Sequence, residues 1–97
     1  MTASKIDFLN TLFKRLQCRM EILQFLKTEN VINDDTVAHL INEPHNTHAQ
    51  LIFSLLNELQ KKEKVQLVDY EWTILPKEFL KLTLVTDNSK KEFTYSV

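Results

Sequence analysis

Apolar side chains in the first two thirds of the chain recur three and four positions apart, which is the spacing of one helix face. We expect a first helix over residues 4–28, with Ser4 as its cap; the alternative is a break near residues 17–19 that gives two shorter helices. The apolar face is wide, so this is either a core helix or a helix that shares its face with a second copy or a partner. The central seam, at spacings of 4, 3, 4 and 3, consists of Leu9, Phe13, Leu16, Met20 and Leu23.

Two shorter helical segments follow, separated by a proline. Residues 34–42 present one apolar face and follow Asn33, a residue type that readily caps a helix. Residues 47–63 begin with Thr47 and Gln50 at the spacing of a capping box. This segment ends in lysines, whose charge suits the carboxyl end of a helix dipole. The sequence therefore predicts three helices before the pattern changes.

From residue 65 onward the apolar positions alternate with polar ones, which is typical of strands with one buried face. Three strands are expected, over residues 65–75, 79–86 and 91–97, with a turn at residues 87–90. Three helices followed by a small three-stranded antiparallel sheet make an α+β fold, and the length fits one domain, residues 1–97. The buried face of the first strand is expected to consist of Val68, Tyr70, Trp72 and Ile74.

The composition is that of an ordinary globular protein, with 43% apolar and 26% charged residues. Twelve basic and thirteen acidic residues leave a formal net charge of −1, so no strong field draws the chain to nucleic acid or to anionic lipid. No apolar run is long enough to span a membrane, so we expect no membrane partner. The single cysteine, Cys18, fits a reducing compartment, and we expect an intracellular protein.

Candidate catalytic and metal-binding chemistry is sparse. The chain contains no glycine, which excludes the glycine-rich loops that bind phosphates and dinucleotides. The three histidines, His39, His45 and His48, do not combine with the cysteine at the spacing of a zinc site. Cys18 lies between two arginines but has no histidine near it in sequence. We therefore expect a protein that is not an enzyme and that holds no cofactor and no metal.

One face of the third predicted helix carries residue types that contact nucleic acid. Gln50, Ser54 and Asn57 are spaced by 4 and 3, so they share a side, and amide side chains can read adenine edges. Phosphate contacts are the weaker part, because residues 46–97 contain seven basic residues, seven acidic residues and no arginine. The lysines that this hypothesis assigns to phosphate groups are Lys61, Lys62, Lys90 and Lys91.

Protein binding is the other large class of function. The predicted sheet contains five aromatic residues in under thirty positions, and an aromatic face left exposed marks a partner site. The last predicted strand also leaves an open edge for pairing. The candidate partner contacts are Leu9, Phe13 and Leu16 on the first helix and Tyr70 and Trp72 on the sheet.

The order of elements resembles a winged-helix domain over residues 19–75. The matching segments, which correspond to that family's three helices and first hairpin strand, are MEILQFL at 20–26, DTVAHLI at 35–41, LLNELQKK at 55–62 and VQLV at 65–68. The family usually places a glycine between the third helix and the strand, where this chain has Glu63 and Lys64. Because the family contains DNA-binding regulators and domains that bind only protein, the resemblance implies a fold and two classes of function.

A weaker similarity links LVDYEW at residues 67–72 to COMM domains, a family of protein-interaction and dimerisation modules. The leading hypothesis is therefore a small non-enzymatic protein-interaction module that acts as a dimer or within a larger assembly. The alternative is a winged-helix transcription regulator that binds DNA through its third helix.

Overall fold

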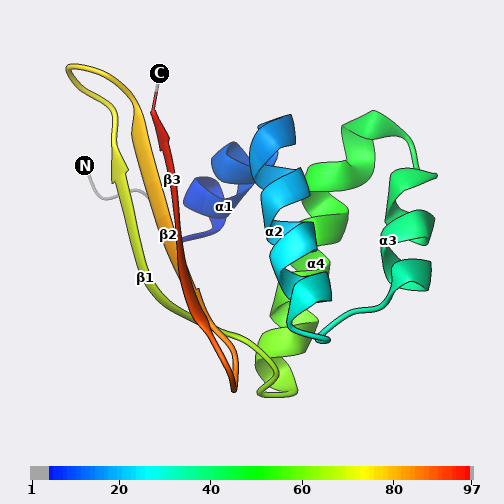
Figure 1. Ribbon diagram of the computed structural model, residues 1–97. Coiled ribbons are helices and arrows are strands. Elements are labelled where there is room, and N and C mark those ends of the chain that lie inside the picture. Colours follow the sequence, from blue (N-terminus) through cyan, green and yellow to red (C-terminus); the bar gives the residue numbers. More distant parts are fainter. Residues whose placement is uncertain (1–4, 97) are drawn as a thin grey trace.

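The computed structural model describes the backbone of residues 5–96 and the side chains of residues 6–96. Within that part of the chain, four α-helices and a short 3-10 helix precede three strands (Figure 1). The expected cap Ser4 lies outside the described residues. The elements are α1 (Lys5–Phe13), α2 (Leu16–Thr28), α3 (Asp34–Ile41), η1 (His45–Thr47), α4 (His48–Lys61), β1 (Gln66–Thr73), β2 (Phe79–Val85) and β3 (Lys90–Ser96).

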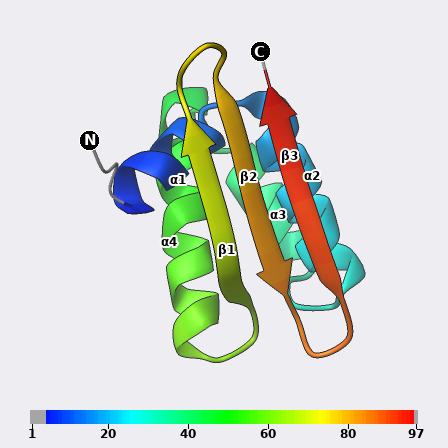
Figure 2. The same ribbon diagram turned by 90° about the vertical axis from the view of Figure 1, so that its left-hand side faces the viewer.

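The predicted α+β class is confirmed. The three strands form one antiparallel sheet in the order β1-β2-β3, so each strand pairs with its neighbour in sequence. In its register, Tyr70 of β1 lies opposite Leu82 of β2, and Leu82 lies opposite Phe93 of β3. Figure 2 shows the sheet from its uncovered face, with the helices behind it.

The chain forms two helices where the sequence predicts one over residues 4–28. A turn at Lys14 and Arg15 separates α1 from α2, and residues 17–19, the alternative break point, lie inside α2. Arg15 has an extended backbone, and its guanidinium pairs with Glu78 in the loop between β1 and β2. The turn redirects the chain, so that α1 lies across the sheet while α2 runs along the strands (Figures 1 and 2).

The helices cover one face of the sheet, and none of the elements within residues 5–96 covers the other face. α1, α2 and α4 lie next to the sheet, and α3 lies on the far side of this helical layer (Figure 1). On the bare face, Lys81 lies between Asp69 and Glu92, with Nζ 3.5 Å and 3.6 Å from their carboxylate oxygens. The sheet residues buried against the helices are Leu80, Leu82, Leu84, Phe93 and Tyr95.

β1 is covered less than the alternating pattern predicts. Val68 and Ile74 are 51% and 53% exposed, Tyr70 is also exposed, and Trp72 is half-buried. β1 lies at one edge of the sheet, and its register shifts near its start. Phe8 of α1 packs beneath it, with ring centroids 4.8 Å from Tyr70 and 6.5 Å from Trp72.

Two helices end in left-handed turns without glycine. Asn30 after α2 and Glu63 after α4 both have φ of 59°. In both turns the N–H of the next residue donates to the carbonyl five positions back, at 2.9 Å, as in the Schellman ending that glycine usually completes. Glu63 stands where a winged-helix domain usually has glycine, so this chain forms the turn with a side chain in place.

Of the two predicted helix caps that lie within the described residues, one is present. Asn33 caps α3, because its Oδ1 accepts a hydrogen bond from the Thr36 N–H at 2.9 Å. The capping box predicted for Thr47 and Gln50 is wrong. Thr47 ends η1, and its hydroxyl donates to the Pro44 carbonyl at 2.7 Å, while Gln50 is exposed. The 3-10 turn leads directly into α4 and takes the place of the side-chain cap.

Candidate functional site

An apolar groove lies between α2 and α3, with the first turns of α4 at its floor. It encloses about 380 Å³. Its floor is formed by side chains that are nearly or fully buried, among them Leu23 of α2, Leu40 of α3 and Ile52 of α4. Side chains of the helical core thus form the bottom of a groove that opens to solvent.

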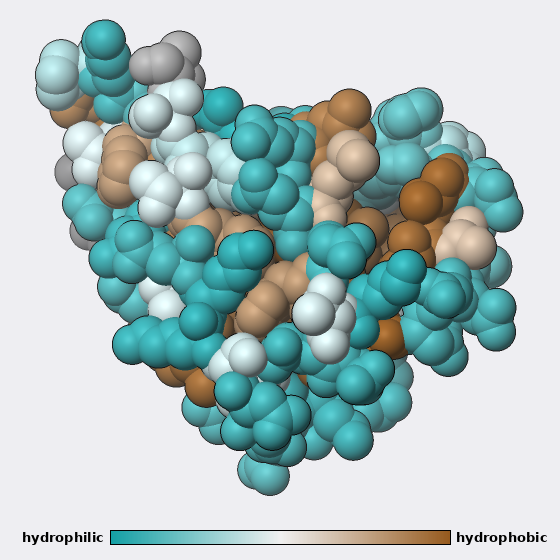
Figure 3. Space-filling view, in the orientation of Figure 1, coloured by the Kyte–Doolittle hydropathy of each residue, from teal (hydrophilic) through white to brown (hydrophobic). Residues whose placement is uncertain are grey.

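Three large apolar side chains stand at the rim of this groove. Leu16 and Met20 of α2 are 55% and 62% exposed, and Ile41 of α3 is 62% exposed. Figure 3 shows apolar atoms gathered over α2 and α3 in the upper right part of that view. A mostly apolar lining with an exposed apolar rim is the surface type that often marks a binding site for another molecule.

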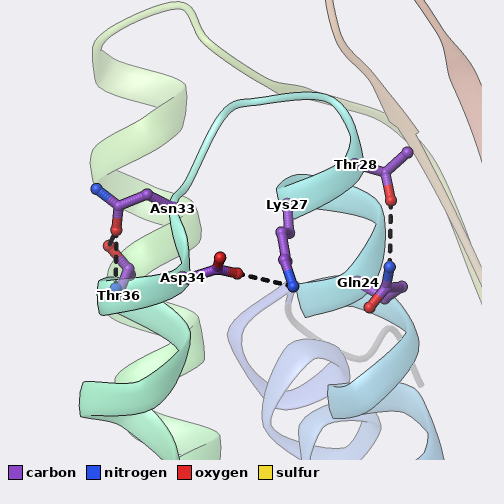
Figure 4. A network of polar contacts seen from close by, with 6 residues as sticks. All are labelled: Gln24, Lys27, Thr28, Asn33, Asp34 and Thr36. Atoms are coloured by element: carbon purple, nitrogen blue, oxygen red, sulfur yellow. Dashed lines mark hydrogen bonds and ion pairs between the residues drawn. The ribbon is translucent and has the colours of Figure 1, made fainter.

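Polar contacts tie the two walls together at one end of the groove. Lys27 near the end of α2 pairs with Asp34 at the start of α3, with Nζ 2.7 Å from Oδ1 (Figure 4). Asn33 holds Thr36 in the same first turn of α3, and Gln24 donates to Thr28 on α2 at 3.3 Å. This end is thereby braced, and the charge of Lys27 is offset within the protein.

Arg19 is the second cationic residue of the lining, after Lys27. Its side chain makes no hydrogen bond or ion pair with any described residue, and its Nε is buried. The described residues that line the groove include no aspartate or glutamate. Arg19 therefore presents an uncompensated positive charge beside the exposed apolar rim.

Two histidines close the groove at the start of α4. The rings of His45 and His48 lie 5.0 Å apart between centroids. His48 is buried, and its Nε2 donates to the Glu43 carbonyl at 2.7 Å, which fixes the ring. Among residues 6–96 there is no group of three or more His, Cys, Asp or Glu side chains placed to hold a metal ion. The histidines thus shape the groove through their rings and this backbone contact.

The structure separates the five residues predicted as partner contacts. Leu9 and Phe13 are 2% and 0% exposed, so they are core residues of this chain and form no contact surface. Leu16, the next member of the same seam, stands at the groove rim. Tyr70 and Trp72 lie together on β1 above Phe8 of α1, at a different part of the molecule from the groove.

The residues predicted to contact nucleic acid are brought together only in part. Gln50, Ser54 and Asn57 are exposed on α4, as are Lys61 and Lys62 near its end. Nζ of Lys62 pairs with Glu58 at 3.1 Å. Lys90 and Lys91 lie on β3, at the opposite edge of the sheet from β1 and α4 (Figure 2), and Nζ of Lys91 is 5.3 Å from the Phe93 ring centroid. The α4 cluster therefore lacks the two β3 lysines.

Cys18 belongs to a buried contact between α2 and β3. Burial raises the pKa of its thiol to about 12, so the thiol stays protonated at neutral pH. The Tyr95 hydroxyl donates to Oε2 of Glu21 at 2.5 Å. This hydrogen bond, with a second from Gln17, lowers the pKa of Glu21, whereas burial raises the pKa of Tyr95. The cluster joins α2 to the sheet and contains no activated nucleophile.

The sequence pattern did not identify the groove. Leu16 and Met20 appear in the predicted seam, and Val37, Leu40 and Ile41 form the predicted apolar face of the second helix. The sequence offered one indirect signal: the two predicted helices have more apolar surface than one small sheet can cover, so some of it should remain exposed. The pairing of these faces across a groove depends on the break at Lys14 and Arg15, which the pattern did not locate.

Comparison with family models, with curated proteins and with solved structures finds no match for this chain. Among residues 5–96, no helix has both the length and the apolar character needed to cross a bilayer. The groove and the surface of α4 are therefore interpreted from their own chemistry.

Proposed function

We propose that this protein is a small non-enzymatic interaction module that binds another protein through the groove between α2 and α3. The observation that carries the proposal is the exposed apolar rim formed by Leu16, Met20 and Ile41 over a buried apolar floor. Burying a Leu, Ile or Met side chain completely stabilises a complex by about 1.5–3 kcal/mol relative to leaving it in water. Each rim residue is already partly covered, so each offers about half of that gain.

The groove has the form that suits an apolar segment of a partner. Two helices form its walls, and grooves between helices commonly accept the apolar face of an amphipathic helix or pack against a second copy. A module of this kind works as a dimer or within a larger assembly. The unpaired thiol of Cys18 supports an intracellular location, because a single buried thiol needs no oxidising compartment.

The test compares the wild-type chain with two exposed-site variants. Met20→Asp places a carboxylate at the groove rim, and Leu75→Asp places one in the β1–β2 loop, where Leu75 is 79% exposed. We expect the wild type either to exceed 11.5 kDa in light scattering or to capture a defined protein in pull-down. Met20→Asp should lose that association, and Leu75→Asp should keep it. A strictly monomeric wild type whose captured proteins are the same as those of Met20→Asp would remove the proposal.

DNA binding through α4 is the second candidate function. It is favoured by the shared exposure of Gln50, Ser54 and Asn57 on one helix. The order α2, α3, α4 followed by the β1–β2 hairpin is also the order that a winged-helix domain uses. Against it stand the paired Lys62 and the distant position of Lys90.

A mobility-shift experiment with duplex DNA of random sequence tests this second candidate. DNA binding predicts an affinity at low salt that falls steeply as salt rises, because phosphate contacts release counterions. Asn57→Ala should weaken the shift, and Asn10→Ala, at an exposed position of α1, should not. No shift in low-salt buffer removes the candidate.

A further inference from the structure

We propose that the occupant of the groove is an acidic amphipathic helix supplied by a different protein. This inference rests on the proposed function and adds the chemistry of the partner. Its basis is the combination of an apolar rim with Arg19, whose side chain has no ion-pair or hydrogen-bond partner among the described residues.

The length of the groove matches a short helix. Its α2 wall extends from Leu16 to Lys27, which is eleven helical steps and corresponds to about 16 Å at 1.5 Å per step. A bound helix of about three turns covers this distance. Its apolar anchors would recur three or four positions apart, facing Leu16 and Met20 on one wall and Ile41 on the other.

The charged residues of the groove indicate which sign of charge the partner carries. Lys27 is offset by Asp34, whereas Arg19 has no carboxylate near it on the lining. An acidic side chain on the flank of the bound helix would give Arg19 a charge-assisted hydrogen bond, in which the guanidinium can use two donors at once. A basic helix would bring like charges together at the same place. The partner is therefore apolar on one face and acidic beside it.

A second copy of this chain does not meet this requirement. In a symmetric pair the same surface of each copy faces the other. The lining then meets a lining that has Arg19 and no aspartate or glutamate, so each Arg19 would stay without a carboxylate. The charge pattern thus favours an acidic partner over self-association through the groove.

The test uses two synthetic helical peptides and the full chain. Both peptides have about 16 residues with leucines on one face at the i, i+3, i+4 and i+7 positions; one carries glutamates on the flanks and its twin carries lysines there. Fluorescence anisotropy of the labelled peptides at low salt gives the two affinities. We expect the glutamate peptide to bind about tenfold more tightly than the lysine twin, and Met20→Asp to abolish its binding.

Variants of Arg19 show whether this residue causes the preference. Arg19→Gln should reduce the preference to about threefold or less, and Arg19→Lys should retain part of it because the charge remains. Lys90→Gln, an exposed change on β3 away from the groove, should leave the preference unchanged. Circular dichroism of each variant establishes that the helices are intact.

The outcomes separate the two proposals. Equal binding of both peptides, tighter binding of the lysine twin, or a preference that Arg19→Gln leaves intact would overturn the acidic helix. A dimer that Met20→Asp dissociates would also overturn it, because the occupant would be a second copy, while the interaction function would stand. The interaction function fails only when Met20→Asp alters neither self-association nor the capture of any protein.

Discussion

α1 and the first half of α2 come from one uninterrupted hydrophobic seam, yet they have opposite surroundings. Leu9 and Phe13 are buried in the core, and Leu16 and Met20 are exposed at the groove. All four side chains are large and apolar, so the residue type does not explain the difference. The explanation is position, since the turn at Arg15 sends α1 beneath the sheet and α2 along its margin.

This comparison distinguishes two properties that the apolar spacing alone does not distinguish: which side chains share a helix face, and whether that face is buried. Spacing of apolar residues determines which side chains share a helix face, because the helix has 3.6 residues per turn. Cover over that face depends on elements far away in sequence, here the strands that lie over α1. An apolar face without cover is a surface available for binding, whereas the same face under a sheet is core.

The largest expected contrast is between the two halves of the seam. Phe13→Ala should lower the free energy of unfolding by about 3–5 kcal/mol, because it leaves a cavity in the core. Met20→Ala should change it by less than about 0.5 kcal/mol, since the side chain is largely in water. Urea denaturation followed by circular dichroism measures both values.

The milder variant Phe13→Leu keeps this comparison measurable if Phe13→Ala does not fold. It should cost about 1–1.5 kcal/mol, still well above the Met20→Ala value. Similar losses for Phe13→Leu and Met20→Ala would mean that the two halves of the seam do not differ in burial.

A second contrast concerns the covered side of α2. Tyr95→Phe removes the hydrogen bond to Glu21 and should lower the free energy of unfolding by about 1 kcal/mol at pH 7. The pKa of Glu21 is lowered in the folded state, so its contribution is full above its ordinary value of 4.5 and is lost as pH falls through the lower folded pKa. Urea midpoints between pH 7 and pH 3 should therefore decline more steeply for the wild type than for Tyr95→Phe.

The slope of that pH profile is the decisive quantity. Gln17→Ala serves as a comparison, because Gln17 donates the second and exposed hydrogen bond to Glu21. It should flatten the profile less than Tyr95→Phe does. Identical slopes for the wild type and Tyr95→Phe would show that Tyr95 does not hold the Glu21 carboxylate.

The smallest expected effect is at the turn that divides the seam. Arg15 pairs with Glu78, and both side chains are about one third exposed, at 30% and 29%. Glu78→Gln should lower the free energy of unfolding by about 0.5 kcal/mol at low salt and by less at high salt, since water and ions screen such a pair. Glu58→Gln breaks the far more exposed pair with Lys62 on α4 and should have almost no effect. An equal loss for both variants would remove the special role of the Arg15 corner.

Much of the fold follows from local pattern. Residues 34–42 were predicted as a helix and α3 spans Asp34–Ile41, capped by Asn33 as expected. The three strands lie within one or two residues of their predicted ranges, because alternation and turn residues define them locally. The helix break could not be located, since Arg15 adopts an extended backbone in company with Glu78, more than sixty positions away.

The candidate site was predictable only in its components. The sequence predicts Leu16 as a partner contact, but the same argument predicts Leu9 and Phe13, which are buried in the core. The groove needs α3 to stand beside α2, a relation between segments that no local pattern encodes. Arg19 gave no signal, because in the sequence a lone arginine on a helix looks like any solvated charge; only the structure shows that its side chain has no partner among residues 6–96.

The left-handed turns at Asn30 and Glu63 have a consequence for how the free chain compares with the folded one. A side chain in this conformation adds steric strain to the native turn, which glycine would avoid. A chain without glycine, however, has fewer accessible backbone conformations when unfolded, so it loses less conformational entropy on folding. Glycine at position 63 would remove the strain of the native turn and would also increase the conformational entropy of the unfolded chain. The two changes oppose each other, and that balance lets this protein dispense with the residue that helix endings usually require.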